Sequence, residues 1–439
     1  MSWSSPTLPL ITKPGEKIYI TTDEGAWLSS IPALGASLGP FITGIIVDHL
    51  GRKRTLLGIL LLFVGCWSVM YFCENLIILL SSRFVAGLGV GCVYATLPMF
   101  VCEISPVKLR GSLCSLLQLF DCFAYLIEYI VGSYATFQNL ILISGILPIL
   151  CFLILVWVPE SPYYLHNKGA KSEAMQALRY FRGYPDSSTL QKEIDELEAS
   201  AENIKNNKRS IITLFTTKGN LKCLYYVAAL VICQQGSGIN VITFYSKSIF
   251  EESGSSFSAN LCSVIVAVVM TCTSIITSTA ARIFKIRNLL LFSSVGITVA
   301  MFSIGTYFYF KDTLNDINSI FGWIPLFSLV LFIFAYTLGY GPLVWVITAE
   351  IFPSHLKAFG CALASSFSWL LAFLLTRYFL LFAINYGKAP AFWLFGCIGI
   401  MSYLFVNFHL PETQNKTFQE IQDMIHGPMQ KKEKNNENP

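Results

Sequence analysis

Long apolar stretches separated by short polar loops dominate the chain. A helix needs about 20 apolar residues to cross a lipid bilayer, and eleven stretches reach that length. They cover approximately residues 26–47, 55–73, 76–101, 112–134, 138–158, 222–247, 259–281, 289–310, 322–349, 356–384 and 389–409. The N-terminal stretch Trp3–Ile11 is too short to span and contains Pro6 and Pro9. The pattern predicts an all-α membrane protein with eleven clear transmembrane helices.

The predicted spans form two sets, separated by a long polar segment rich in Lys and Glu. Such composition is typical of surface helices and disordered ends rather than of a packed core. We therefore expect four parts: an N-terminal helical bundle with five clear spans, a cytoplasmic linker with short helices, a C-terminal six-helix bundle and a cytoplasmic tail. Their expected bounds are 1–158, 159–221, 222–409 and 410–439.

A weak internal repeat supports this division into two halves. Glu103 and Arg110 stand seven residues apart after one span, and Glu350 and Lys357 have the same spacing in the second half. A Pro-Glu pair also follows the last span of each half, at Glu160 and Glu412. Internal repeats of this kind are typical of transporter folds.

The orientation follows from the distribution of basic residues. Lys and Arg gather in one alternating set of short loops, as at Arg52–Arg54, and this set is expected to be cytoplasmic. The tail falls on the same side, and residues 1–25 fall on the opposite side. An odd number of spans with an external N-terminus is unusual. Either one helix is missing from the start, or the protein is an eleven-span variant.

Composition excludes several classes of protein. With 54% hydrophobic and 13% charged residues, the chain is not an ordinary soluble protein, and its mean hydropathy is +0.59. A net charge of +4 without basic–aromatic runs argues against a nucleic-acid partner. The cysteines are scattered singly, which predicts neither disulfides nor a metal site. No loop carries paired carboxylates or an activated nucleophile, so we expect no enzyme and no cofactor.

One polar stretch, Gln234–Asn240, interrupts an otherwise apolar span. Its amides, Gln234, Gln235 and Asn240, are costly in a membrane unless they face protein, water or a ligand. Amides carry both donors and acceptors, which suits neutral, hydroxyl-rich solutes. The glycines at 236 and 238 weaken the helix and permit close approach. The alternative is a polar contact between helices at a glycine kink.

Two further spans carry polar or aromatic candidates. Gln118 lies one turn before Asp121 on the same helix face. In the second half, Gly341-Pro342 is expected to break its span, because proline frees a backbone carbonyl. Trp345 follows this step and offers a flat ring on which a sugar face could stack. The alternative for Trp345 is a position facing lipid.

Three charged residues are predicted inside spans. Arg83 and Glu128 lie at matching depths, about seven residues from the same surface, and Asp121 lies two turns deeper than Glu128. A charge inside a membrane predicts function and a partner. We expect a buried Arg83–Glu128 pair, with Asp121 free to take up a proton. Alternatively, Arg83 reaches the headgroups and the acids face a pore. The glycines at 87, 89 and 91 are expected to expose one helix face for close packing.

The segment Gly44–Arg54 forms a tight loop between two spans. Asp48 ends one helix, and Arg52, Lys53 and Arg54 follow it. A carboxylate beside three cations can form a charge clamp to a helix end across the bundle. Simple anchoring of the loop on the cytoplasmic side is the alternative.

These motifs, in this order, resemble the sugar porter family of the major facilitator superfamily, and most of all the insect facilitated trehalose transporters. The resemblance covers nearly the whole chain and implies a two-bundle helical fold that moves sugars by alternating access. It places solute contacts at Gln118, Gln234, Gln235, Asn240 and Trp345. It also implies a gating charge network of Asp48, Arg52, Arg54, Glu103, Arg110, Glu160, Glu350 and Lys357, which would lock the outward-open state.

The chain also departs from the family pattern. The family's first span is absent apart from its end. In the second half, the loop that should read Asp-x-x-Gly-Arg-Arg is Arg282–Arg287, so its acid and its glycine are lost. Family asparagines align with Met270 and Ser368, and the second proline of the Gly-Pro-x-Pro-Trp pattern is Val344.

The expected function is transport of a small neutral sugar, a hexose or a disaccharide such as trehalose, across a bilayer, most simply the plasma membrane. Facilitative uniport is favoured by the resemblance. The open alternatives are proton-coupled symport, for which Asp121 and Glu128 are candidates, and a sugar sensor or pseudo-transporter that does not transport, which the departures favour. The sequence leaves the oligomeric state open.

Overall fold

The computed structural model describes residues 3–11, 20–106, 109–183, 212–254, 257–313, 321–353, 356–412 and 424. All regular elements in these ranges are helices. The first set is α1 (Ser4–Ile11), α2 (Thr22–Leu50), α3 (Arg52–Phe72), α4 (Leu76–Ile104), α5 (Arg110–Tyr134), α6 (Phe137–Trp157), α7 (Pro162–Asn167) and α8 (Lys171–Arg182). The second set is α10 (Thr213–Thr216), α11 (Lys218–Gly236), α12 (Ile239–Ser253), α13 (Ala259–Ile283), α14 (Ile286–Thr313), α16 (Ile324–Leu338), α17 (Tyr340–Ile351), α18 (Lys357–Tyr386) and α19 (Lys388–Phe408).

The eleven predicted spans are confirmed. In the described residues, 11 helical segments are long and apolar enough to cross a membrane. Two of these spans consist of two helices each: α11 continues into α12, and α16 into α17. The short helix α1 does not count among them. Because each span is a continuous apolar stretch, the sequence alone was enough to place it.

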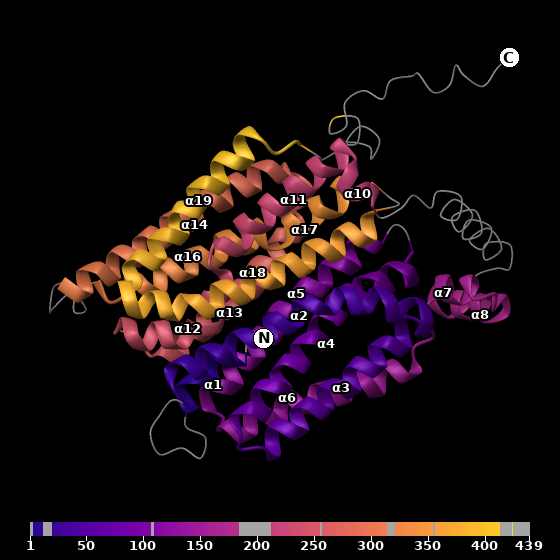
Figure 1. Ribbon diagram of the computed structural model, residues 1–439, viewed down its shortest axis with the longest axis horizontal. Coiled ribbons are helices and arrows are strands. Elements are labelled where there is room, and N and C mark those ends of the chain that lie inside the picture. Colours follow the sequence, from indigo (N-terminus) through magenta and orange to yellow (C-terminus); the bar gives the residue numbers. More distant parts are fainter. Residues whose placement is uncertain are drawn as a thin grey trace.

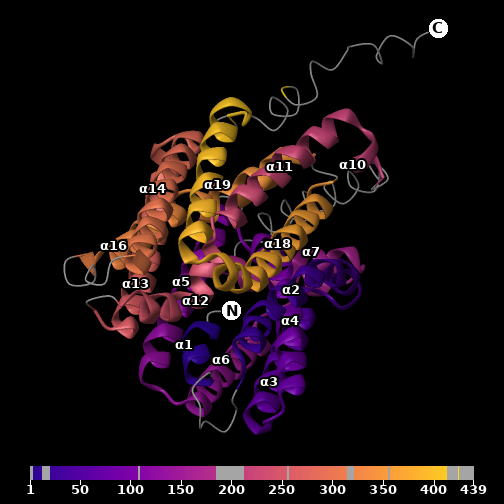
Figure 2. The same ribbon diagram turned by 60° about the vertical axis from the view of Figure 1, so that its left-hand side comes forward.

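The helices form two groups that lie side by side (Figures 1 and 2). The first group contains α1–α6 and the second α11–α19. Between the groups, α2 packs on α18, α5 on α13, and α1 on α12. The helices α7 and α8 lie at one end of the molecule, here called the α7 end, and α1 lies toward the opposite end, the α1 end (Figure 1).

Small residues bring α2 and α4 into close contact. A Cβ at Gly87 would lie 2.0 Å from the carbonyl oxygen of Pro32, and one at Gly91 would lie 2.2 Å from that of Ala36. Gly89 instead faces the ring of Phe63 on α3, at 2.9 Å. Close packing was predicted correctly, but the three glycines do not share one face, since alternate positions of a helix point about 200° apart.

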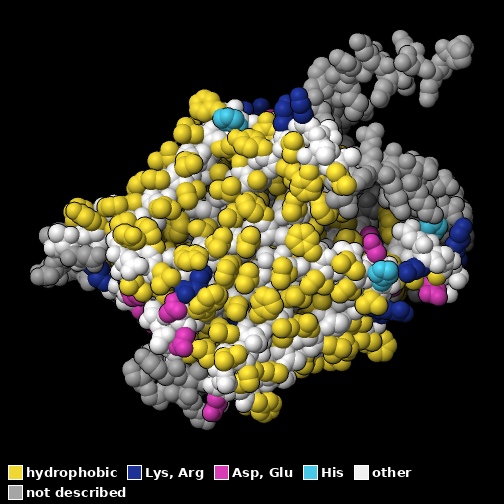
Figure 3. All heavy atoms as spheres, in the orientation of Figure 1, with side chains coloured by type: hydrophobic (Ala, Val, Ile, Leu, Met, Phe, Trp, Pro, Cys, Tyr) yellow, Lys and Arg dark blue, Asp and Glu magenta, His cyan; other side chains and the backbone are white. Residues whose placement is uncertain are grey.

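Apolar side chains cover most of the face seen in Figure 3, and the charged side chains gather at its right and upper edge and toward its lower left. This is the distribution that a bilayer requires, with a wide apolar band between two polar rims. The chain is an integral membrane protein with several spans.

Candidate functional site

The polar stretch 234–240 forms a break between two helices. α11 ends at Gly236, and α12 begins at Ile239. Gly238 has a φ of +87°, and a Cβ there would lie 2.7 Å from the ring of Phe395. Only glycine combines this backbone conformation with so close a neighbour. The break therefore holds the flanking amides in fixed positions within the second group.

Gln234 joins this break to a second one. Its side-chain amide donates to the carbonyl oxygens of Tyr340 at 2.8 Å and Gly341 at 3.1 Å, in the first turn of α17. The residue is 1% exposed, and its Oε1 atom has no hydrogen-bond partner among the described residues. Two interrupted helices thus meet at one level, with one buried acceptor left over.

The second break lies at Gly339, two residues before the Gly341–Pro342 step that the sequence indicated. α16 ends at Leu338, and α17 starts at Tyr340. Pro342 falls within the first turn of α17, where a missing N–H costs nothing. Gly339 has the irregular conformation, with φ −125° and ψ −84°. A side chain does not fit there, because a Cβ would lie 2.5 Å from the Cβ of Ser293.

Gln235 and Asn240 form a chain of hydrogen bonds with α18. The Gln235 amide donates to Oγ of Ser368 at 2.6 Å, and the Asn240 amide donates to Oε1 of Gln235. Gln235 is buried and Asn240 is half-buried. Ser368 thus holds the amide chain in place.

The other two predicted solute contacts come from neighbouring elements. Gln118 on α5 is half-buried, and its amide lies 3.7 Å from Sγ of Cys122, one turn further along. Trp345 on α17 is half-buried and packs against the apolar core of the second group. The structure thus places candidates from both groups, although the hydrogen-bonded chain itself lies in the second.

Arg83 finds a different partner from the expected one. It is 3% exposed. Its guanidinium donates to Oγ of Ser4 at 2.8 Å and lies 4.4 Å from the centre of the Trp3 ring. Glu128 is near enough to interact electrostatically with Arg83, although no direct salt bridge joins the two side chains among the described residues. Matching depth does not fix the direction in which side chains point, and α1 takes up the guanidinium instead.

The two acids of α5 have separate surroundings. Glu128 accepts a hydrogen bond from Oγ of Ser144 on α6 at 3.1 Å. Asp121 lies beside Tyr94 of α4. Both acids are half-buried. They therefore do not share one site, although they are on one helix.

A clamp at the α7 end ties α3 to α4 and to the start of α7. Arg52, the first residue of α3, donates to Oε1 of Glu103 through Nη2 at 2.9 Å and Nε at 3.1 Å. Ser161 donates to the other oxygen of Glu103. Asp48 lies 3.9 Å from Arg52 but is largely exposed, so its contribution is small. The predicted clamp forms around Arg52 and Glu103, within the first group.

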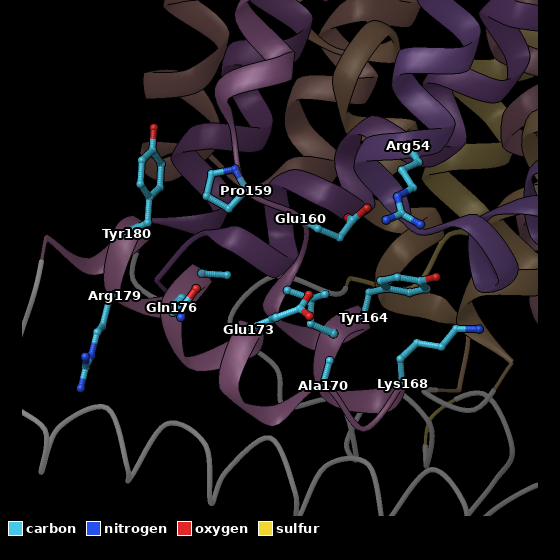
Figure 4. A pocket seen from close by; sticks show the side chains of 12 residues that line it. Arg54, Pro159, Glu160, Tyr164, Lys168, Ala170, Glu173, Gln176, Arg179 and Tyr180 are labelled. Carbon is cyan, nitrogen blue, oxygen red and sulfur yellow. The ribbon is translucent and has the colours of Figure 1, made fainter.

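Glu160 binds the N-terminus of α3. Its carboxylate accepts backbone N–H groups of Arg52 at 3.1 Å and Lys53 at 3.0 Å. A Cβ at Gly51, whose φ is +93°, would lie 2.5 Å from Oε2 of Glu160, so glycine makes this approach possible. Arg54 and Glu160 also line a pocket of about 730 Å³ against α7 and α8 (Figure 4).

The remaining predicted network residues stay outside the clamp. Oε2 of Glu350 is buried without a hydrogen-bond partner in the part of the chain that the structure describes. Lys357 is exposed. The side chain of Arg110 lies outside the described residues, as do the whole segment 184–211 and most of the tail.

Contacts between the two groups occur at the α1 end and near the centre. Arg377 of α18 donates to Asp23 of α2 at 2.8 Å and stacks on Trp27 at 4.7 Å. Tyr129 donates to the carbonyl of Thr243. Near the centre, the Tyr94 and Trp369 rings meet edge to face at 5.6 Å.

Sequence reasoning missed several of these residues. For Asp23 and Arg377 a signal existed, namely two charges near span ends, but they are 354 residues apart and nothing in the pattern pairs them. Ser161 and Ser368 gave no signal from composition, since a hydroxyl in a helix normally bonds its own backbone.

Comparison with known proteins shows which family the chain resembles in sequence. The family model described as "Sugar (and other) transporter" matches residues 11–425. A facilitated trehalose transporter Tret1 from Polypedilum vanderplanki is 31% identical over 409 residues, which are 93% of this chain and 81% of that protein. Tret1 from Bombyx mori is 31% identical over 95% of this chain and 82% of its own length.

Solved structures of the xylose transporter XylE from E. coli have the same fold. The inward open conformation aligns with a TM-score of 0.80 at 21% identity, over 96% of this chain and 95% of XylE. The partially occluded inward open conformation gives 0.77 at 23% identity, over 95% of each chain. The two-bundle fold is therefore of the major facilitator type, as predicted.

Proposed function

The chain belongs to the sugar transporter family, and from this premise we propose that it is a facilitative carrier of a small neutral sugar, a hexose or a disaccharide such as trehalose. The observation that carries the proposal is the hydrogen-bonded chain Ser368–Gln235–Asn240 beside the joined helix breaks. Transporters bind their solutes at such breaks, near the membrane midplane. Gln118 and Trp345 complete the site from α5 and α17.

The unused acceptor of Gln234 supports the same site. A buried carbonyl oxygen without a partner costs about 1–3 kcal/mol. A sugar hydroxyl that donates to Oε1 of Gln234 removes this cost, so binding a polyol is favoured over binding an apolar solute. The amide of Gln234 stays bonded to α17 meanwhile, so that this residue continues to join the two breaks.

Alternating access follows from the contacts between the groups. Because Asp23 and Arg377 join α2 to α18 at the α1 end, the arrangement supports a state in which solute leaves toward the α7 end. We assign the α7 end to the cytoplasm from the basic loops, and the membrane to the plasma membrane. The clamp around Arg52 and Glu103 then lies at the inner mouth of the carrier.

Uptake by the protein in liposomes tests the proposal. Gln235→Ala removes both the acceptor of Asn240 and the donor to Ser368, so counterflow of radiolabelled glucose and trehalose should fall at least about tenfold, with protein amount unchanged. Gln176→Ala, an exposed glutamine of α8, is the matched control and should keep wild-type uptake. Wild-type counterflow in Gln235→Ala contradicts the site.

The same assay decides between uniport and symport. Asp121 and Glu128 lie within a span, and a carboxylate there can carry a proton. A uniporter shows the same initial rate with and without a proton gradient, and a protonophore does not change it. Sugar binding without counterflow identifies a sensor instead.

A further inference from the structure

Asp121 is a charged residue that the proposed sugar site leaves unused. It shares a face of α5 with Gln118, one turn away. No ion pair joins its carboxylate to a cation among the described residues, and Arg83 is already engaged by Ser4 and Trp3. A carboxylate inside a membrane is costly and marks a function that needs the charge.

Two tyrosines of the first group flank this carboxylate, and one of them contacts a ring of the second group. Tyr94 of α4 and Tyr125 of α5 lie beside it. Tyr94 is 46% exposed although α4 packs between α2 and α3. Because its ring also meets Trp369 of α18, the exposed part of Tyr94 lies between the two groups. A solute located there can therefore reach both the ring and the acid.

Tyr336 connects Asp121 to the amide site. This tyrosine of α16 lies beside both Gln234 and Asp121. A single small solute can therefore contact the Gln234 acceptor through a hydroxyl and reach Asp121 with another group. That second group should be a cation, because a neutral hydroxyl is already served by amides at lower desolvation cost.

We propose that Asp121, Tyr94 and Tyr125 bind the protonated amine of an amino sugar whose hydroxyls occupy the amide site. A carboxylate supplies the opposite charge, and the faces of aromatic rings attract an organic ammonium group. The inference rests on the proposed function for the hydroxyl contacts, and it extends the substrate class from neutral sugars to amino sugars.

The test is competition against radiolabelled glucose counterflow by two probes, glucosamine and its neutral derivative N-acetylglucosamine, at mildly acidic pH where the amine is protonated. The readout is the ratio of their half-inhibiting concentrations, which does not depend on the absolute rate. Wild-type protein should favour glucosamine by about tenfold or more. Asp121→Asn should abolish this preference, so that glucosamine inhibits no better than N-acetylglucosamine. Glu128→Gln, with its acid held by Ser144, should keep the wild-type ratio.

Two tyrosine variants guard against a folding defect in Asp121→Asn. Tyr94→Phe keeps the aromatic face and should keep a preference for glucosamine, whereas Tyr94→Leu removes the face and should reduce it severalfold. An unchanged ratio in Asp121→Asn and in Tyr94→Leu overturns the proposal. So does an Asp121→Asn protein that loses only a response to a proton gradient, because the acid would then be a proton carrier.

A binding measurement separates this proposal from the proposed function. Glucosamine should raise the melting temperature of the purified wild-type protein in detergent, and Asp121→Asn should lose that increase. This measurement needs no transport. If wild-type liposomes move no glucose while the Asp121-dependent stabilisation persists, the carrier function fails and the amine site stands. If glucose counterflow is robust and glucosamine gives no stabilisation, the amine site fails alone.

Discussion

Glu103 and Glu350 stand at equivalent places in the two groups of helices, and their surroundings differ. Each is the second-last residue of its helix, α4 or α17. Glu103 binds Arg52 and Ser161, whereas Oε2 of Glu350 is buried without a partner in the described ranges. The partners therefore depend on what the neighbouring loop supplies.

The loops that lead into α3 and α14 differ most at the first residue of the helix, which in α3 supplies the partner of Glu103. Arg52 is the first residue of α3, and its counterpart, the first residue of α14, is the buried Ile286. Both loops nevertheless share one interaction, a hydrogen bond from a basic side chain to a backbone carbonyl near the end of a neighbouring helix. Lys53 donates to the carbonyl of Val156 near the end of α6, and Arg287 donates to that of Asn407 near the end of α19.

The comparison shows two separable functions in the same motif. The second cation ties a helix end to its neighbour in both groups, which is a structural role. The first cation and the glycine before it build the acid clamp, which the described residues show in the first group and not in the second. We therefore expect the first group to be rigid at the α7 end and the second to be held there mainly by apolar packing.

The largest effect should come from Glu160→Ala. The change removes a carboxylate that accepts the first N–H groups of α3 and the N–H of Ser161. A hydrogen bond to a charged group stabilises by about 1.5–3 kcal/mol when it is desolvated. Because Glu160 is only half-buried, solvent screens these bonds and water can replace the carboxylate, so the three together should contribute roughly 2–4 kcal/mol. The melting temperature in detergent should fall, and transport with it.

Glu173→Ala is the matched control for this change. Glu173 is an exposed acid of α8 that lines the same pocket as Glu160 (Figure 4). Its removal should leave the melting temperature within error of the wild type. If Glu160→Ala and Glu173→Ala have the same melting temperature, the carboxylate of Glu160 at the start of α3 does not anchor the clamp.

A smaller loss of stability should distinguish Glu103 from its equivalent Glu350. Glu103→Gln weakens a nearly buried pair with Arg52 and should cost about 1–3 kcal/mol, because the guanidinium stays buried without its counter-charge. Glu350→Gln neutralises a carboxylate with an unpartnered oxygen and should be neutral or stabilising. Melting temperatures of the two variants, measured side by side, check the difference. Equal losses would show that Glu350 has a partner of comparable strength.

Much of this architecture was predictable from the sequence, because spans, breaks and loop cations are local patterns. Gln234 and Gln235 in an apolar stretch indicated the break in its span. Partners across the bundle were not predictable: Arg83 turns to Trp3 and Ser4, and Gln235 to Ser368. Depth in the membrane can be counted along a helix, but the direction of a side chain depends on how neighbouring helices are rotated.

The clamp around Arg52 and Glu103 shows the same limit of prediction from sequence. The loss of the second-half motif was visible at Arg282–Arg287, where Ile286 takes the place that Arg52 has in the first group. The sequence did not reveal that Arg287 keeps a carbonyl tie or that Ser161 joins Glu103. Such contacts involve backbone carbonyls and hydroxyls, which every helix end offers and which therefore carry no specific pattern.

The smallest effect should come from rebuilding the missing clamp with Ile286→Arg. The new guanidinium can pair with Glu350, but it replaces a packed apolar side chain, so the two contributions nearly cancel and the single variant should change stability by less than about 1 kcal/mol. The pairing itself should appear as coupling of about 1 kcal/mol between Ile286→Arg and Glu350→Gln in a double-mutant cycle. Ile283→Arg, at an exposed position near the end of α13, should show no coupling to Glu350→Gln. Coupling in this control as well would mean that any added cation acts on Glu350 through the general field, and that the position of Arg52 in the first group is not what gives Glu103 its partner.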